Sequence, residues 1–296
     1  MSQGRVLILL YHRVADLPSD PQLLAVNPGR FEEHLGVIRA RGLETVLISD
    51  LAGGTNWPRG DAVAITFDDG YADNFSHARP ILARYGVKAT FFVASDHLEG
   101  GREFWWDELE RLLLPGGAGD WTVLSPPRTK AHSAYLKACA RMRVMPRVRR
   151  ERVLQGLRRA AGDCGAARPQ WRAMTTGELR SLDEPGQLEV GGHTLGHVLL
   201  SAETPQIQLE EIQGDKVALE TILGRSLTAF SYPYGSVGDF DAVSKAVATG
   251  AGYSVACANY PGLALPGTDP MELPRNLVRD WSGEQFAARL DEWLTA

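Results

Sequence analysis

The feature that most constrains the fold is the regular alternation of short apolar runs with amphipathic helical patterns. We predict strands where the apolar runs fall, at residues 6–11, 62–67, 87–94, 188–191, 227–232 and 253–258. We predict helices at residues 28–41, 73–85, 205–223, 240–249 and 283–294. A helix between two strands returns the chain to the same end of the sheet, so the strands pair in parallel. The pattern therefore predicts an α/β fold, a closed or nearly closed (β/α) barrel with its chemistry at the carboxyl ends of the strands.

A single long segment departs from this alternation. The stretch from Phe104 to about Met174 has no strand pattern. It starts with FWWDELERLLL and continues in the basic helical run RMRVMPRVRRERVLQGLRRAAG. We expect a helical insertion at about residues 104–174, whose arginines form a solvated face, with a binding site as the alternative. No repeat or low-complexity linker divides the chain, so residues 1–296 are expected to form a single domain.

Composition excludes several classes of protein. The net charge of −5 and the pI of about 5.8 leave no basic footprint for nucleic acid. The cysteines are odd in number and far apart, which favours a reducing compartment over a disulfide framework for Cys139, Cys164 and Cys257. The first apolar run ends in Tyr-His-Arg without a cleavage site, and no run reaches the ~20 residues of a membrane span. We therefore expect a cytoplasmic protein without a membrane span, and the sequence does not indicate its oligomeric state.

Two short motifs that follow apolar runs hold residues of the kind that bind metals. TFDDG places Asp68 and Asp69 side by side, where repulsion and desolvation are costly unless a cation lies nearby. GGHTLGH places His193 and His197 at an HxxxH spacing that lets both imidazoles reach one metal. With Asp69 as a third ligand, the set is typical of a hydrolytic metal site that keeps open positions for water and substrate. Either motif alone is a weak signal, because DDG often marks a turn and spaced histidines often lie in a core or on a surface.

Together with SYPYG at residues 231–235, these motifs resemble those of the polysaccharide deacetylases, the family-four carbohydrate esterases with a NodB-homology domain. The likeness runs in order through most of the chain outside the insertion. It implies a distorted (β/α) barrel of the NodB-homology type that forms a single catalytic domain. It also implies a metal-dependent hydrolase of non-peptide carbon–nitrogen bonds, whose partner is an N-acetylated sugar or glycoconjugate.

The resemblance also assigns roles to the matching residues. Asp68 is the expected general base. The expected ligands of a divalent metal ion are Asp69, His193 and His197. Zinc is the ion we expect, with Co²⁺, Ni²⁺ or Mn²⁺ as alternatives. Pro233 and Tyr234 of the PYG motif are expected to bind substrate, with the Tyr234 backbone N–H at the oxyanion.

The chain departs from the usual family motifs at two positions. The usual acid histidine near the C-terminus is missing, since no histidine follows His197. His12 ends the first predicted strand and is the candidate acid, because the first and last strands of a barrel are neighbours. The biofilm poly-N-acetylglucosamine deacetylases look similarly rearranged, and an ordinary strand-end histidine is the alternative. Ser231 replaces the arginine that usually orients the base; Arg275 is the candidate substitute, with a surface salt bridge as its alternative.

Four other side chains have simpler expectations. Trp105 and Trp106 start the insertion, and they either stack on a sugar ring at the barrel rim or anchor the insertion by apolar packing. His34 and His77 are expected on exposed helix faces.

Three functions are compatible with this pattern. The leading hypothesis is a metal-dependent deacetylase that removes the N-acetyl group of an amino sugar. A hydrolase of a non-sugar amide bond is the second, although relatives of that kind often lack the full Asp-His-His set. A non-catalytic carbohydrate-binding domain is the third, and it predicts erosion of the base or of a ligand. The intact Asp68, Asp69, His193 and His197 favour the deacetylase.

Overall fold

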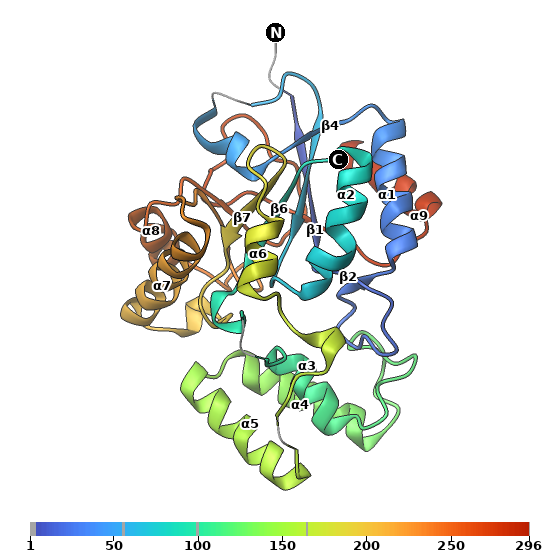
Figure 1. The fold of residues 1–296 in the computed structure, drawn as a ribbon, viewed down its shortest axis with the longest axis vertical. Helices are drawn as coiled ribbons and strands as arrows, with labels where there is room; N and C mark the ends of the chain where they lie inside the picture. Colours follow the sequence, from blue (N-terminus) through green and yellow to red (C-terminus); the bar gives the residue numbers. More distant parts are fainter. Residues whose placement is uncertain (1–3, 55–56, 99–100, 164, 296) are drawn as a thin grey trace.

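A curled, all-parallel sheet forms the centre of the computed structural model, which describes residues 4–54, 57–98, 101–163 and 165–295 (Figure 1). The strand order is β10-β1-β5-β6-β7-β8-β9, and β4 pairs beside the first half of β5. The strands are β1 (Val6–Tyr11), β4 (Glu44–Val46), β5 (Ala62–Phe67), β6 (Ala89–Val93), β7 (Leu188–Gly192), β8 (Ala229–Ser231), β9 (Val255–Cys257) and β10 (Asn276–Leu277). A separate parallel pair joins β2 (Arg13–Val14) to β3 (Ala25–Val26). The prediction of a distorted (β/α) barrel is confirmed.

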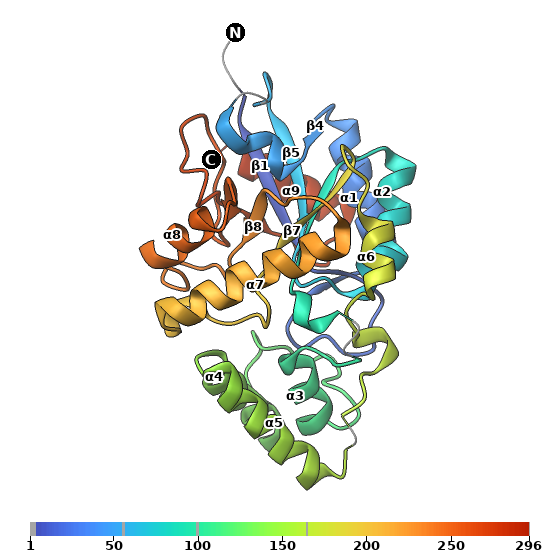
Figure 2. The ribbon, with the colours of Figure 1, turned by 60° about the vertical axis from the view of Figure 1, so that its left-hand side comes forward.

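Helices cover the outside of the sheet because its strands are apolar on both faces. Every residue of β1, β5 and β6 is buried, as a parallel sheet requires. The covering α-helices are α1 (Pro28–Ala40), α2 (Arg79–Tyr85), α6 (Thr176–Leu182), α7 (Pro205–Leu223), α8 (Ala242–Gly250) and α9 (Gly283–Thr295). Shorter turns are η1 (Ile48–Gly54), the π-helical η2 (Asn74–Ala78), η3 (Ser95–His97), η4 (Pro169–Trp171) and η5 (Leu200–Ala202). Figure 2 shows α7 and α8 together on one flank.

The barrel closes through the segment that follows β9. Leu273 bridges to Cys257 of β9, and three residues later β10 pairs with β1. Arg275 lies between these two pairings and is buried. The segment therefore carries a cation into the barrel at the join between its last and first strands.

Three helices of the segment from Phe104 onward lie beyond the end of the barrel opposite the N-terminus (Figures 1 and 2). They are α3 (Trp105–Leu113), α4 (Lys130–Arg143) and α5 (Arg147–Ala161), and α3 contacts both others. They enclose an apolar core of their own that includes Phe104, Trp121 and Tyr135. Ion pairs join them to the barrel, from Arg143 to Asp239 at 2.6 Å and from Arg147 to Asp96 at 2.5 Å.

The expectation of a solvated arginine face is wrong for part of this segment. Arg150 is buried, and its guanidinium lies 5.6 Å from the Trp105 ring. Arg158 pairs with Glu108 at 2.7 Å. These arginines face inward because acceptors there compensate for desolvation of the cation. Arg158 has Glu108 within the insertion, and Arg150 has the Gly196 carbonyl in the barrel loop after β7.

His34 is also placed differently from the expectation of an exposed helix face. It is buried, its Nε2 lies 2.8 Å from the Trp281 carbonyl, and its ring stacks on Phe286 at 4.2 Å. His34 is buried because its partners Trp281 and Phe286 lie in and next to α9, which packs against α1. His77 is exposed, as expected. Cys139 and Cys257 are free thiols, and Cys164 lies outside the described residues. None of the described helices is both long and apolar enough to cross a bilayer.

Candidate metal centre

The candidate residues gather at one end of the barrel because the strands are parallel. His12 directly follows β1, Asp68 follows β5 and His193 follows β7. Arg275 reaches the same edge from the amino end of a strand, because it directly precedes β10, which pairs with β1 near the end of that strand. The carboxyl ends of parallel strands meet at one edge, so residues far apart in the sequence become neighbours there.

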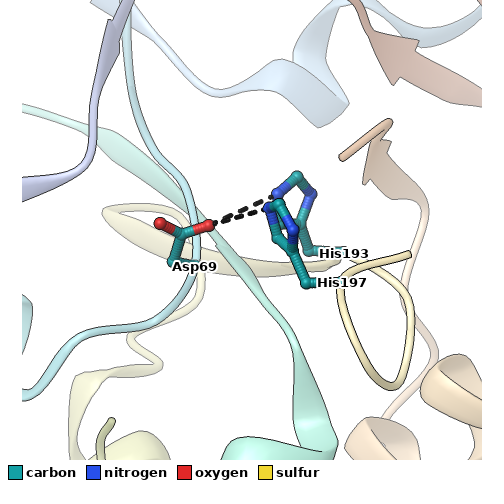
Figure 3. Close-up of side chains that lie close together, drawn as sticks. All are labelled: Asp69, His193 and His197. Atoms are coloured by element: carbon teal, nitrogen blue, oxygen red, sulfur yellow. Dashed lines mark ion pairs between the residues drawn. The ribbon is translucent and has the colours of Figure 1, made fainter. Parts of the chain in front are cut away.

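Asp69, His193 and His197 converge on a point that suits a metal ion (Figure 3). Asp69 Oδ1 lies 3.2 Å from His197 Nε2 and 3.7 Å from His193 Nε2. The Nδ1 atom of His193 lies 2.7 Å from the Ser231 carbonyl, so this nitrogen donates and Nε2 presents its lone pair inward. Asp69 Oδ1 is buried and has no hydrogen-bond partner among the described residues. An orphaned carboxylate oxygen facing two imidazole nitrogens fits a divalent ion such as zinc.

The pKa shifts of these three side chains also favour a bound cation. Burial raises the pKa of Asp69 above its ordinary value. Burial lowers the pKa of His193 to about 4 and that of His197 to about 3. The histidines are therefore neutral near pH 7, which is the form that binds metal, while the Asp69 carboxylate lacks a cation.

Asp68 has a different partner from its neighbour Asp69. Arg275 donates to both carboxylate oxygens of Asp68, each at 2.7 Å, in a bidentate pair. Arg275 also donates to Ser231 Oγ at 2.8 Å and to Thr66 Oγ1 at 3.2 Å. Burial by itself raises the pKa of Asp68, but Arg275 and His193 outweigh it and hold that pKa well below its usual range. Asp68 is therefore an ionised, fixed carboxylate.

Backbone strain is concentrated in the loops that carry these residues. The described non-glycine residues with positive φ number five, and four of them are Asp69, Thr194, His197 and Tyr234, with φ of 77°, 64°, 50° and 62°. Side chains other than glycine rarely adopt this conformation, and it persists where the surroundings over-determine it. The strain supports a functional constraint on these loops.

The histidine loop, residues 193–197 after β7, is held in place by residues that sequence reasoning missed. Asp215 of α7 accepts hydrogen bonds from the backbone N–H groups of His193 at 2.8 Å and Ser95 at 3.0 Å. Glu211 of the same helix accepts from the Gly196 N–H at 2.8 Å, and Arg150 donates to the Gly196 carbonyl at 2.9 Å. One signal was available in the sequence. Asp215 falls at helical spacing between Ile212 and Leu219, so it interrupts an apolar stripe.

A cavity of about 670 Å³ unites the candidate residues. Its lining includes the sequence-derived candidates His12, Asp68, Asp69, Trp105, Trp106, His193, His197 and Tyr234. Arg275 contacts Asp68. Pro233 is buried, and its carbonyl accepts a hydrogen bond from the Gly235 N–H at 2.7 Å.

His12 and the two tryptophans have surroundings that bear on their roles. His12 is half-buried, and burial lowers its pKa, an effect that the charges of Asp69 and Asp68 oppose. Trp105 and Trp106 belong to the apolar core of the insertion, which agrees with the interpretation that they anchor it. They also line the cavity, and stacking on a sugar ring stays a prediction. Trp106 is fixed by donation from its Nε1 to the Tyr71 hydroxyl at 2.9 Å.

A parallel barrel with an Asp-His-His set and a second carboxylate at its carboxyl edge is typical of a metal-dependent hydrolase. A family model described as polysaccharide deacetylase matches residues 56–118 and 166–256, just over half of the chain. The chain belongs to the polysaccharide deacetylase family, as the sequence motifs indicated. The stretch between the two matched segments contains α4 and α5.

Known relatives extend the match over nearly the whole chain. The Bacillus subtilis protein YxkH, provisionally named a polysaccharide deacetylase, is 23% identical over 292 residues, which cover 97% of this chain and 77% of that protein. IcaB from Ammonifex degensii has a TM-score of 0.64 at 21% identity, over 100% of this chain and 98% of that one. A de-N-acetylase from Aggregatibacter actinomycetemcomitans has a TM-score of 0.62 at 17% identity, over 98% and 99% of the two chains. At these identities, the two solved structures establish a shared fold.

Proposed function

We propose that this protein is a metal-dependent deacetylase that removes the N-acetyl group of an amino sugar or glycoconjugate and releases acetate. The observation that carries the proposal is the meeting of an Asp-His-His set with an arginine-held carboxylate in one cavity. Family membership supports hydrolysis of an acetyl group. The Aggregatibacter protein of the same fold is named a de-N-acetylase, which supports an amide as the scissile bond.

Asp69, His193 and His197 would hold the metal ion, which we expect to be zinc, with Co²⁺, Ni²⁺ or Mn²⁺ as alternatives. When bound, a divalent cation polarises an amide carbonyl and lowers the pKa of a bound water. The remaining chemistry falls to side chains and backbone groups of this chain.

Asp68 is the proposed general base. It is ionised at neutral pH, and Arg275 fixes both of its oxygens, so the carboxylate is ready to take a proton from the attacking water. We assign the Tyr234 backbone N–H to the developing oxyanion, because Tyr234 lines the cavity in a strained turn. Pro233 restricts the backbone before that turn.

His12 is the proposed general acid toward the leaving amine. It lines the cavity together with Asp68, and the other two histidines of the described lining are the proposed ligands. Because burial leaves His12 neutral near pH 7, it must first receive a proton. The proton that Asp68 removes from water is the available source, and the leaving nitrogen is its destination.

Acetate release is the direct test of this function. Purified protein would be incubated with nucleotide-linked N-acetylglucosamine, short chitin oligomers and simple N-acetyl glycosides, with and without added zinc. We expect zinc-dependent release on at least one substrate and a loss of about 10³-fold or more in the Asp68→Asn variant. Glu284→Gln, at an exposed residue of the first turn of α9, is the matched control.

The other outcomes of this test separate the alternatives. Release from simple non-sugar acetamides, with none from the sugars, would replace the sugar deacetylase by a general amide hydrolase. Absence of both release and zinc binding, in protein that binds sugar, would favour a carbohydrate-binding domain.

A further inference from the structure

The cavity that holds the reactive residues also has an aliphatic wall. Five branched aliphatic side chains line it: Leu24, Val123, Leu124, Leu136 and Leu277. They come from the turn between β2 and β3, from the insertion, and from β10. Leu124 is 74% exposed, and the other four are half-buried. Leu24, Val123 and Leu136 pack against the apolar core of the insertion with part of their surface and leave the rest exposed toward the cavity.

This wall suits a hydrocarbon better than it suits a sugar. Sugars are held by directional hydrogen bonds and by the flat faces of aromatic rings, which Trp105 and Trp106 offer elsewhere in the lining. Branched aliphatic groups offer only apolar contact, and they gain most when they cover another apolar chain. The lining therefore separates into a polar reactive part and a part that fits an aliphatic group.

An unneutralised cation lies in the same lining. Arg279 is half-buried and donates to the backbone carbonyls of Gln22, at 3.4 Å, and Leu23. In the described part of the chain, no carboxylate lies within 4.0 Å of its guanidinium to form an ion pair, and burial lowers its pKa. Arg143, the other arginine of the lining, is already paired with Asp239 at 2.6 Å. Arg279 is thus the cation available to an anionic group of a ligand.

We propose that the substrate is an N-acetylated sugar joined through a phosphate to an aliphatic chain. The assignment rests on the proposed deacetylase function. The sugar lies against Asp68 and the Asp-His-His set, the phosphate against Arg279, and the chain against the aliphatic wall. A nucleotide-linked sugar shares the phosphate but has no hydrocarbon, so the wall is what distinguishes the two substrates.

The charge of the insertion suits a substrate held in a membrane. Residues 126–161 contain eleven Lys or Arg and one acidic residue, in a chain whose net charge is −5. Six of these cations are exposed and, within the described chain, form no ion pair: Lys130, Lys137, Arg141, Arg149, Arg152 and Arg159. Val144 and Val148, where α4 gives way to α5, are 56% and 67% exposed. Basic and apolar side chains together favour an anionic lipid surface, where a chain-linked sugar phosphate resides.

Binding of short alkyl phosphates tests the wall and the arginine independently of catalysis. Tryptophan fluorescence reports binding, since Trp105 and Trp106 line the cavity. The probes are butyl, hexyl and octyl phosphate, with inorganic phosphate, octyl glucoside and uridine diphosphate for comparison. We expect affinity to rise about two- to threefold per methylene, and octyl phosphate to bind about tenfold or more tightly than each comparison ligand.

Variants test separately which residues bind the alkyl chain of the ligand and which residue binds its phosphate. Leu124→Ser and Leu136→Asn should each reduce the gain in affinity per methylene of the alkyl phosphate. Leu124 is exposed, so its substitution leaves folding intact. Arg279→Gln should reduce octyl phosphate to the affinity of octyl glucoside, whereas Arg39→Gln, an exposed position on α1, should change nothing. Uridine diphosphate binding more tightly than octyl phosphate, or a chain-length dependence that both leucine variants retain, would overturn the proposal.

Turnover separates this proposal from the function on which it rests. The substrates are the methyl and octyl phosphodiesters of N-acetylglucosamine, with acetate release as the readout. A kcat/KM that is about tenfold or more higher for the octyl compound supports binding of the substrate's hydrocarbon chain by the aliphatic wall. Equal values would uphold the deacetylase and reject the aliphatic substrate. No turnover of either compound would reject deacetylation of such sugars. The affinities for alkyl phosphates would still show whether the aliphatic wall binds a hydrocarbon chain.

Discussion

Asp68 and Asp69 are adjacent in the chain, yet the structure gives them opposite surroundings. Both oxygens of Asp68 are held by Arg275, whereas the buried Oδ1 of Asp69 faces His193 and His197. The positive φ of Asp69 turns the backbone between them, so that two neighbouring carboxylates point to different partners. One carboxylate is thereby neutralised by the protein, and the other is left for a metal.

The Arg275 pair gives a prediction at this scale. Arg275→Lys keeps the charge but loses the bidentate geometry, so Asp68 should remain ionised and become poorly oriented. We expect kcat for acetate release to fall about 100-fold, with zinc affinity unchanged because Arg275 does not contact the ligands.

A matched control is available at another bidentate pair. Arg5 donates to both oxygens of Asp61 at a partly exposed site near the start of β1, and Arg5→Lys should leave kcat unaltered. Loss of zinc binding in Arg275→Lys would show that the arginine supports the ligand set instead, contrary to the role assigned here.

At the scale of elements, the site depends on α7 as much as on the strands. Asp215 uses its two oxygens to accept the N–H groups of His193 and Ser95, which joins the ends of β6 and β7. Asn at this position keeps one acceptor and points an amide N–H at a backbone N–H. We predict that Asp215→Asn weakens zinc affinity about 10- to 100-fold, measured by competition with a chromophoric chelator.

Glu210→Gln provides the comparison for that measurement, because Glu210 lies on the exposed side of the same helix. Its zinc affinity should equal that of the unmodified protein. If Asp215→Asn also binds zinc normally, the histidine loop keeps its geometry without α7.

The elements that could be predicted from the sequence are those with long, uniform patterns. β1 and β5 match their predicted bounds because each is an almost uninterrupted run of apolar residues, broken in β5 only by Thr66. The bounds of α7 match because Thr204 and Gly224 cap it. The two- and three-residue strands β2, β3, β4 and β10 were not predicted. Their residues become strands only by pairing with distant partners, and so few residues carry no periodicity.

The site residues also divide into those that a local motif predicts and those whose role depends on contacts between distant elements. Asp68, Asp69, His193 and His197 could be named because two compact motifs carry them directly after apolar runs. Arg150 and Asp215 could not be assigned a role, since their contacts depend on how two helices lie over the histidine loop. His34 was misplaced for a related reason, because Trp281, whose carbonyl lies within hydrogen-bond distance of its ring, is distant in sequence.

For the molecule as a whole, the insertion and the barrel share one cavity, and we propose that residues 1–296 form a single catalytic domain. Arg143, Arg147 and Arg150 each connect the insertion to barrel loops. We therefore predict one cooperative thermal transition, with equal calorimetric and van't Hoff enthalpies.

Arg147→Gln removes the contacts to Asp96 and Glu211 and sharpens the calorimetric test. In a single domain it should lower Tm by a few degrees and leave one transition, because the loss is shared by the whole unit. Two separable transitions, in the unmodified protein or in this variant, would mean that the insertion folds independently.

The central claim is that one metal ion, held by Asp69, His193 and His197, supports deacetylation assisted by Asp68. The most direct measurement titrates metal-depleted protein with zinc and follows acetate release from an N-acetylated sugar at each ratio. The account predicts activity that rises linearly and levels off at about one zinc per chain, with no activation of a His193→Ala variant. Full activity in protein shown to be free of metal, or activation that persists in His193→Ala, would contradict it.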